Sequence, residues 1–159
     1  MPICRLTERD IVCLNHQYVL EYHGKAGAVV LDSSDLHLAV ARAEAASDLD
    51  QCAAALLVNL ARGNAFEFGN CGTAIMSATT LYPLNGRLLV ADPRVDDLEE
   101  SESEGSPGPN TPDSGHRSSR EVSSFHVLVR LARQGKIDEA AAAGWLKQYS
   151  CELEGPYLY

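Results

Sequence analysis

The sequence predicts an all-α protein, a small helical bundle built around two central helices. Three observations predict this fold class: apolar side chains recur at helical spacing along several segments, capping residues precede those segments, and glycines follow them. With 159 residues, of which 45% are hydrophobic and 22% charged, the chain can bury the core of one domain. We expect residues 1–91 and 121–159 to form that domain, interrupted by an insertion at 92–120.

Six segments are expected to be helical. They are 7–22, the segment from the capping residues 32–35 to 46, 48–62, 73–84, the segment from 121 to Gly135, and 137–149. Thr7 is the expected N-cap of the first helix, with Asp10 completing a capping box. The segment 48–62 is apolar on almost every side, which predicts the buried centre of the bundle.

The connections between these helices differ in character. The apolar run 28–31 is either a strand-like flap or a plain extended connection, 64–72 is a loop, and 87–91 is one short strand. Residues 92–120 are rich in Ser, Pro, Gly and acidic residues, and we expect them to be disordered because they offer little apolar surface to bury. They are either a regulatory or partner-binding arm or, as we favour, a tolerated surface insertion.

Most of the negative charge lies in that insertion. The net charge is −9, and residues 92–113 hold eight acidic residues and one basic residue, so seven of the nine charges are there. Such a balance argues against nucleic acid or an anionic membrane as a partner. No apolar run reaches the roughly 18–20 residues that cross a bilayer, and no signal peptide is visible, so we expect a cytoplasmic protein.

Five cysteines are scattered along the chain without a CxxC pair. An odd, widely spaced set of this kind predicts reduced thiols rather than a disulfide framework or a structural zinc site. We therefore expect no metal site formed by cysteines.

One segment carries a recognisable motif, followed by a Leu-Asn-Gly at 84–86. The motif reads Asn64-Ala65-Phe66-Glu67-Phe68-Gly69-Asn70-Cys71-Gly72-Thr73. It resembles the motif of the Fic/Doc (Fido) family, His-Pro-Phe-x-Asp/Glu-Gly-Asn-Lys/Gly-Arg-Thr-Ala, and the flanking helices are similar to those of its death-on-curing branch. The resemblance covers the chain outside the insertion. It implies a Fido-like bundle and a bacterial protein of toxin–antitoxin type.

Four motif positions depart from the family. The resemblance places the catalytic base at Asn64, the magnesium-holding acid at Phe68, and phosphate-binding cations at Cys71 and Gly72, and none of these residues has the required chemistry. An amide is no general base near neutral pH, and losing a base commonly costs about 10²–10⁴ in rate. The retained residues are Phe66, Gly69, Asn70 and Thr73, which we expect to keep the architecture of the loop.

The motif also supplies the candidate site residues. The catalytic candidates are Asn64, Glu67 and Cys71, and the candidates for binding a cofactor are Gly69, Asn70, Cys71, Gly72 and Thr73. Asn70 is expected to cap the helix that follows, and the amides of 70–73 to form an anion-binding nest. His37 and His126 are candidates to approach the loop, although a lone histidine is more often a surface or satisfied core residue, and His16 and His23 have no motif context.

These departures predict a degenerate Fic/Doc-like protein without conventional AMP- or phosphotransferase activity, a pseudoenzyme that retains a ligand pocket, a partner-binding role, or both. The alternative is an enzyme of altered chemistry, using Cys71, Glu67 or a nearby histidine on a small molecule or a protein. The third interpretation is a toxin that transfers a nucleotidyl or phosphoryl group to a protein hydroxyl. The resemblance implies a small antitoxin-like partner, and ATP or another nucleotide with magnesium only where activity is retained.

Overall fold

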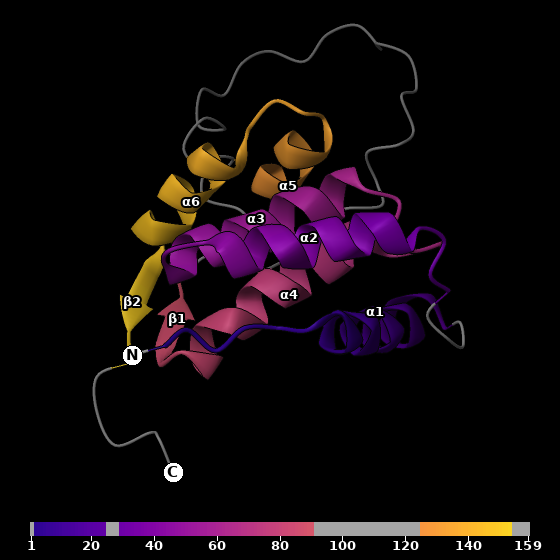
Figure 1. Cartoon of the computed structure of the whole chain (residues 1–159), viewed down its shortest axis with the longest axis horizontal. Helices are drawn as coiled ribbons and strands as arrows, with labels where there is room; N and C mark the ends of the chain where they lie inside the picture. Colours follow the sequence, from indigo (N-terminus) through magenta and orange to yellow (C-terminus); the bar gives the residue numbers. More distant parts are fainter. Residues whose placement is uncertain (1, 25–28, 91–124, 154–159) are drawn as a thin grey trace, which may run out of the picture.

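The computed structural model describes residues 2–24, 29–90 and 125–153 (Figure 1). These residues form six helices and two short strands: α1 (Glu8–His23), α2 (Ser33–Ala45), α3 (Leu49–Arg62), α4 (Asn70–Leu84), β1 (Arg87–Leu89), α5 (Phe125–Arg133), α6 (Glu139–Gln148) and β2 (Ser150–Glu152). The expected helices are present, with ends that shift by a few residues. The insertion expected at 92–120 lies outside the described residues.

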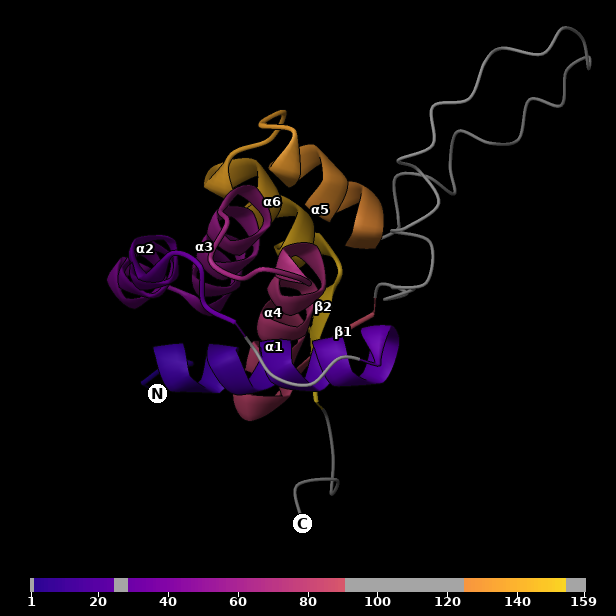
Figure 2. The ribbon, with the colours of Figure 1, turned by 90° about the vertical axis from the view of Figure 1, so that its right-hand side faces the viewer.

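Helix α3 is the centre of the fold, as its sequence predicts. It packs against α2, α4, α5 and α6, and most of its side chains are buried, including Leu56, Leu57 and Leu60. Figure 2 shows α3 and α4 in the middle, α2 to one side and α5 with α6 to the other. Burying so many aliphatic side chains removes a large apolar area from water, which is the main stabilising term of the bundle.

Helix α1 crosses the outside of α4 (Figure 2). The expected capping box is present: the Thr7 hydroxyl accepts from the Asp10 amide at 3.3 Å, and the Asp10 carboxylate accepts from the Thr7 amide at 2.8 Å. The hydrogen bond from the Thr7 hydroxyl is the main reason that the pKa of Asp10 lies below its usual value. These bonds satisfy amides that the first helical turn leaves unpaired.

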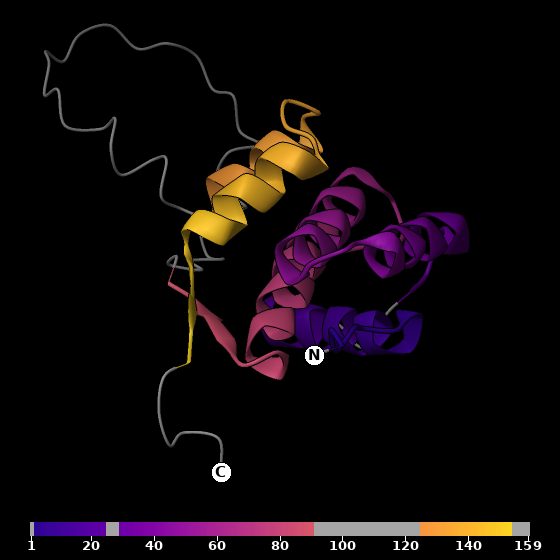
Figure 3. The ribbon, with the colours of Figure 1, turned by 60° about the vertical axis from the view of Figure 1, so that its left-hand side comes forward.

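The structure is mostly helical, as expected, and it also contains one small antiparallel ribbon. The strand expected at 87–91 is shorter, Arg87–Leu89, and it pairs with β2, which the sequence analysis did not predict. Figure 3 shows the ribbon between the end of α4 and the end of α6. Helix α6 stops at Gln148, and the chain then turns at Tyr149 into the strand. The pairing joins segments distant in sequence, so no local pattern announces it.

A buried polar cluster fastens this ribbon to the helices. The Tyr82 hydroxyl donates to Asp50 at 2.8 Å, and the Arg87 guanidinium contacts the other Asp50 oxygen at 3.3 Å and Ser150 at 2.5 Å. Burial, and then the bond to Asp50, raises the pKa of Tyr82. Elements α3, α4, β1 and β2 thus meet at Asp50 of α3. The contact from α4 is made by Tyr82, near the end of that helix farthest from the motif loop.

Within the described residues, none of the helices combines the length and the apolar character that crossing a bilayer requires.

Candidate functional site

The motif loop, residues 64–69, precedes α4, and one edge of its backbone forms hydrogen bonds with residues 29–31. The Leu31 amide donates to the Ala65 carbonyl at 2.8 Å, and the Glu67 amide donates to the Val29 carbonyl at 3.0 Å. Residues 29–31 are therefore a strand-like flap rather than a plain connection, which decides between the two expectations for this run. We call residues 29–31 the flap.

Polar side chains from neighbouring helices hold the opposite edge of the loop. The backbone amide of Asn64 donates to the Asp35 carboxylate of α2 at 2.8 Å. The Asn70 side chain accepts from the Phe66 amide at 3.0 Å and donates to the Phe66 carbonyl at 2.8 Å. The loop backbone is thus bonded along both edges, so its shape is fixed before any ligand arrives.

Asn15 of α1 holds the far end of the loop. Its Nδ2 donates to the Phe68 carbonyl at 2.8 Å and to the Thr73 hydroxyl at 2.9 Å, and its side chain is almost fully buried. The sequence analysis did not single out Asn15. One local feature could have indicated it: Asn15 lies on the same face of α1 as Ile11 and Tyr18, which are buried. A polar side chain on a buried face normally has a hydrogen-bonding partner, so its position predicts a contact with another element.

Helix α4 begins earlier than expected, at Asn70 rather than at residue 73. Gly69 is its N-cap, with a left-handed φ of 76° and no side-chain cap, so the expected cap by Asn70 is wrong. The reason is that both polar atoms of the Asn70 side chain are bonded to Phe66. Glycine suits this sharp entry because it adopts positive φ at little cost.

Tyr18 fills the space that a side chain at position 72 would need. A Cβ atom built on Gly72 would lie 2.1 Å from Cζ of Tyr18, and one built on Gly69 would lie 2.7 Å from Cδ1 of the same ring. The ring itself is buried and stacks against Tyr22 at 4.9 Å between centroids. The resemblance assigns a cation to position 72. Glycine stands there instead, and the Tyr18 ring fills the space that a cationic side chain would need.

The side chains that do face solvent from the loop are Asn64, Glu67 and Phe68. Within the described residues, neither the Asn64 nor the Glu67 side chain has a hydrogen-bonding or ionic partner that would orient it as a general acid or base. Phe68 is 40% exposed, whereas Phe66 is buried in the core as expected. An exposed aromatic ring thus stands where the resemblance places a metal-binding carboxylate.

Cys71 has a cationic neighbour that sequence reasoning missed. The Arg133 guanidinium at the end of α5 donates to Sγ of Cys71 at 3.3 Å, and Cys71 is partly exposed in the first turn of α4. The two residues are separated by 62 positions, so their contact has no signal in local spacing. Arg133 thus brings a cation to the first turn of α4.

His37 pairs with α1 rather than with the motif loop. His37 is exposed, and its Nδ1 lies 2.9 Å from a Glu8 carboxylate oxygen, where it lines a hollow of about 570 Å³ with Ser33 and Ser34. His126 is partly buried in the first turn of α5. Among the described residues, no three His, Cys, Asp or Glu side chains come together as metal ligands would.

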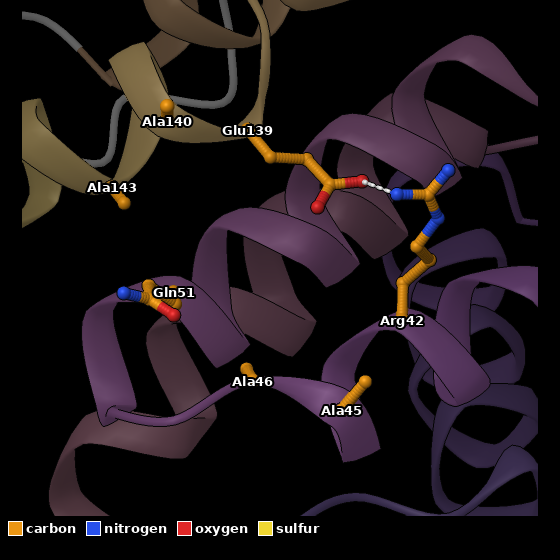
Figure 4. Close-up of a pocket in the computed structure, with 7 residues that line it drawn as sticks. All are labelled: Arg42, Ala45, Ala46, Gln51, Glu139, Ala140 and Ala143. Carbon is orange, nitrogen blue, oxygen red and sulfur yellow. Dashed lines mark ion pairs between the residues drawn. The ribbon is translucent and has the colours of Figure 1, made fainter.

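A second hollow, of about 460 Å³, lies away from the motif loop among α2, α3 and α6 (Figure 4). Four alanines line it, and Arg42 and Glu139 face each other across its rim at 3.8 Å. Glu139 also accepts from Asn59 at 2.8 Å. Because one positive and one negative group share this rim, the hollow favours neither an anion nor a cation.

Comparison with known proteins adds no relative. No protein-family model matches the sequence, and no curated protein matches it closely enough to indicate kinship.

Proposed function

We propose that this protein is a non-catalytic binding protein on a degenerate Fic/Doc-like scaffold, and that it recognises an extended peptide segment of a partner at the flap and motif loop. One observation carries the proposal: Asn64 faces solvent with no partner for its side chain among the described residues, and Tyr18 fills the side-chain space at Gly72. The Fic/Doc assignment itself rests on the motif at 64–73.

The loop lacks what phosphoryl or nucleotidyl transfer requires. Such reactions depend on positioned cations and a magnesium ion that neutralise developing charge on the phosphates, and on a group that takes a proton from the attacking hydroxyl. The Asn64 side chain is an amide, the Phe68 side chain carries no oxygen, and Gly72 has no room for a side chain. Arg133 offers one cation, but it contacts Sγ of Cys71.

The flap offers a place for an extended peptide. Residues 29 and 31 use their backbone to pair with the loop, while the Val30 amide and carbonyl have no partner among the described residues. Val29 and Leu31, the two neighbours of Val30, expose apolar side chains, and Phe68 exposes its ring on the loop. An open strand edge flanked by apolar side chains is what strand addition uses, with main-chain bonds giving affinity and side-chain contacts giving specificity.

The first experiment tests the absence of nucleotide chemistry. We expect ATP with magnesium to leave the thermal unfolding midpoint of the purified protein unchanged, and radiolabelled ATP to label no protein in a lysate of candidate targets. A rise of several degrees with ATP and magnesium, together with labelling that Asn64→Ala abolishes, would contradict the proposal and favour the transferase interpretation.

The second experiment tests the peptide site with a displayed library of random linear peptides. Peptides enriched on the wild type should bind Leu31→Ser and Val30→Pro at least about tenfold more weakly, since the first removes apolar contact and the second an unpaired amide. Leu84→Ser is the matched control: Leu31 is 62% exposed and Leu84, at the far end of α4, is 50% exposed. No enrichment, or equal weakening by Leu31→Ser and Leu84→Ser, contradicts the proposal.

A second candidate function is favoured by the contact between Cys71 and Arg133. A thiol in the first turn of a helix beside a guanidinium is more readily a nucleophile than an ordinary thiol, which fits an enzyme of altered chemistry. The test is the rate of alkylation by iodoacetamide, residue by residue, at pH 7. Cys71 must react faster than the exposed Cys13 in the wild type and lose that advantage in Arg133→Gln. If it reacts more slowly than Cys13, this candidate fails.

A further inference from the structure

We infer that Asn15 is a positioning residue for the binding surface: it sets the end of the motif loop at which Phe68 faces the partner. The role of Asn15 in partner binding rests on the proposed function, whereas its role in holding the loop rests on its contacts alone. Asn15 lies 53 residues before Phe68, yet its Nδ2 donates to the Phe68 carbonyl at 2.8 Å.

The three side chains that hold the loop act at different points. Asp35 holds the amide of residue 64, and Asn70 holds residue 66 from within the same segment. Asn15 holds residue 68, and it does so from α1, a separate helix. Since the chain turns sharply at Gly69 directly afterwards, the Asn15 bond is what fixes the loop on the near side of that turn.

The same face of α1 also sets the first turn of α4. Asn15 donates to the Thr73 hydroxyl at 2.9 Å, and the Tyr18 ring, three residues further along α1, packs against Gly72. The end of the loop and the start of α4 are thus both held by α1. A movement of α1 relative to α4 would carry Phe68 with it.

A merely structural role fits Asn15 poorly. Its Oδ1 is buried with no hydrogen-bonding partner among the described residues, and an orphaned buried acceptor costs stability that an apolar residue in the α1–α4 interface would avoid. The residue therefore sacrifices packing stability at this place. In return, its Nδ2 donates two hydrogen bonds, one of them to the loop backbone at the Phe68 carbonyl.

The test compares two variants that each remove one partner of the same buried hydrogen-bond set. Asn15→Leu removes both donors, whereas Thr73→Val is nearly isosteric and leaves the Asn15–Phe68 bond in place. Hydrogen exchange is measured at the Leu31 and Glu67 amides, whose bonds join flap to loop. We expect about tenfold faster exchange in Asn15→Leu and less than about twofold change in Thr73→Val. Should Asn15→Leu fail to fold, Asn15→Asp keeps the shape and removes the donors at neutral pH.

Peptide affinity supplies the second readout. A peptide selected on the wild type should bind Asn15→Leu at least about fivefold more weakly and Thr73→Val equally well, because disordering a preformed loop raises the cost of binding. If no peptide is ever selected, the proposed function fails, while the exchange measurement still decides the role of Asn15. Equal exchange in the two variants at Leu31 and Glu67 overturns the inference.

Discussion

Gly72→Ala is expected to destabilise the protein, although the same change usually stabilises a helix. The gain in helix propensity is about 0.5–1 kcal/mol. Against it stands the contact with Tyr18, since the new methyl group would lie 2.1 Å from Cζ of a buried ring. Overpacking of this kind costs about 1–3 kcal/mol, and so close an approach to a ring belongs at or above the upper end.

The net effect is therefore a loss of about 2 kcal/mol or more, which lowers the melting temperature by roughly 4–8 °C in a chain of this size. Gly144→Ala in α6 is the matched control, because a Cβ atom there has no neighbour within 4 Å. That variant should gain about 0.5–1 kcal/mol. Both changes are measured by thermal and urea unfolding followed by circular dichroism.

A double-mutant cycle identifies Tyr18 as the cause. Tyr18→Ala alone should cost about 3–5 kcal/mol, as removal of a large buried aromatic ring does. In that background Gly72→Ala should no longer destabilise, which gives a coupling energy of about 2–3 kcal/mol. A Gly72→Ala variant as stable as Gly144→Ala would refute the placement of the ring, and with it the argument that no cation fits at position 72.

Two further predictions concern polar groups outside the site. Asp50→Ala should cost about 3 kcal/mol in urea unfolding, because it leaves Arg87 without its buried anion; a cost below about 1 kcal/mol would show that the cluster is not a stabilising tie. Asp10→Asn tests the capping box through its pH dependence. Because the folded-state pKa of Asp10 is lowered, the carboxylate stabilises the fold above pH 3.8 and loses that effect as the pH falls through the folded-state pKa. The difference in stability between wild type and Asp10→Asn should therefore shrink as the pH falls through the folded-state pKa of Asp10, and a difference that stays constant over the whole acid titration contradicts the assignment.

The helices were predictable because their signals are local. Thr7 and Asp10 lie three residues apart, and the apolar character of 48–62 is visible within one window. The start of α4 was placed too late for an equally local reason. Asn70 has the chemistry of a cap, but its side chain is bonded to Phe66, so Gly69 makes the turn instead.

The place of the candidate loop in the sequence was predictable, but the contacts that surround it were not. The motif predicted a loop at 64–72, and the structure ends that loop at Gly69, before α4 begins. The motif cannot show that residues 29–31 pair with the loop, because either a flap or a plain connection agrees with a short apolar run.

The sequence by itself therefore determined the helical class, the central helix and the presence of an amide side chain at position 64, since these depend on residue types and short spacings. The tertiary structure alone decided that Tyr18 fills the space at Gly72, that Asn15 holds Phe68, and that Arg133 reaches Cys71. Each of these contacts joins residues more than 50 positions apart. They arise when whole helices pack, and packing depends on shape and volume, which no local pattern records.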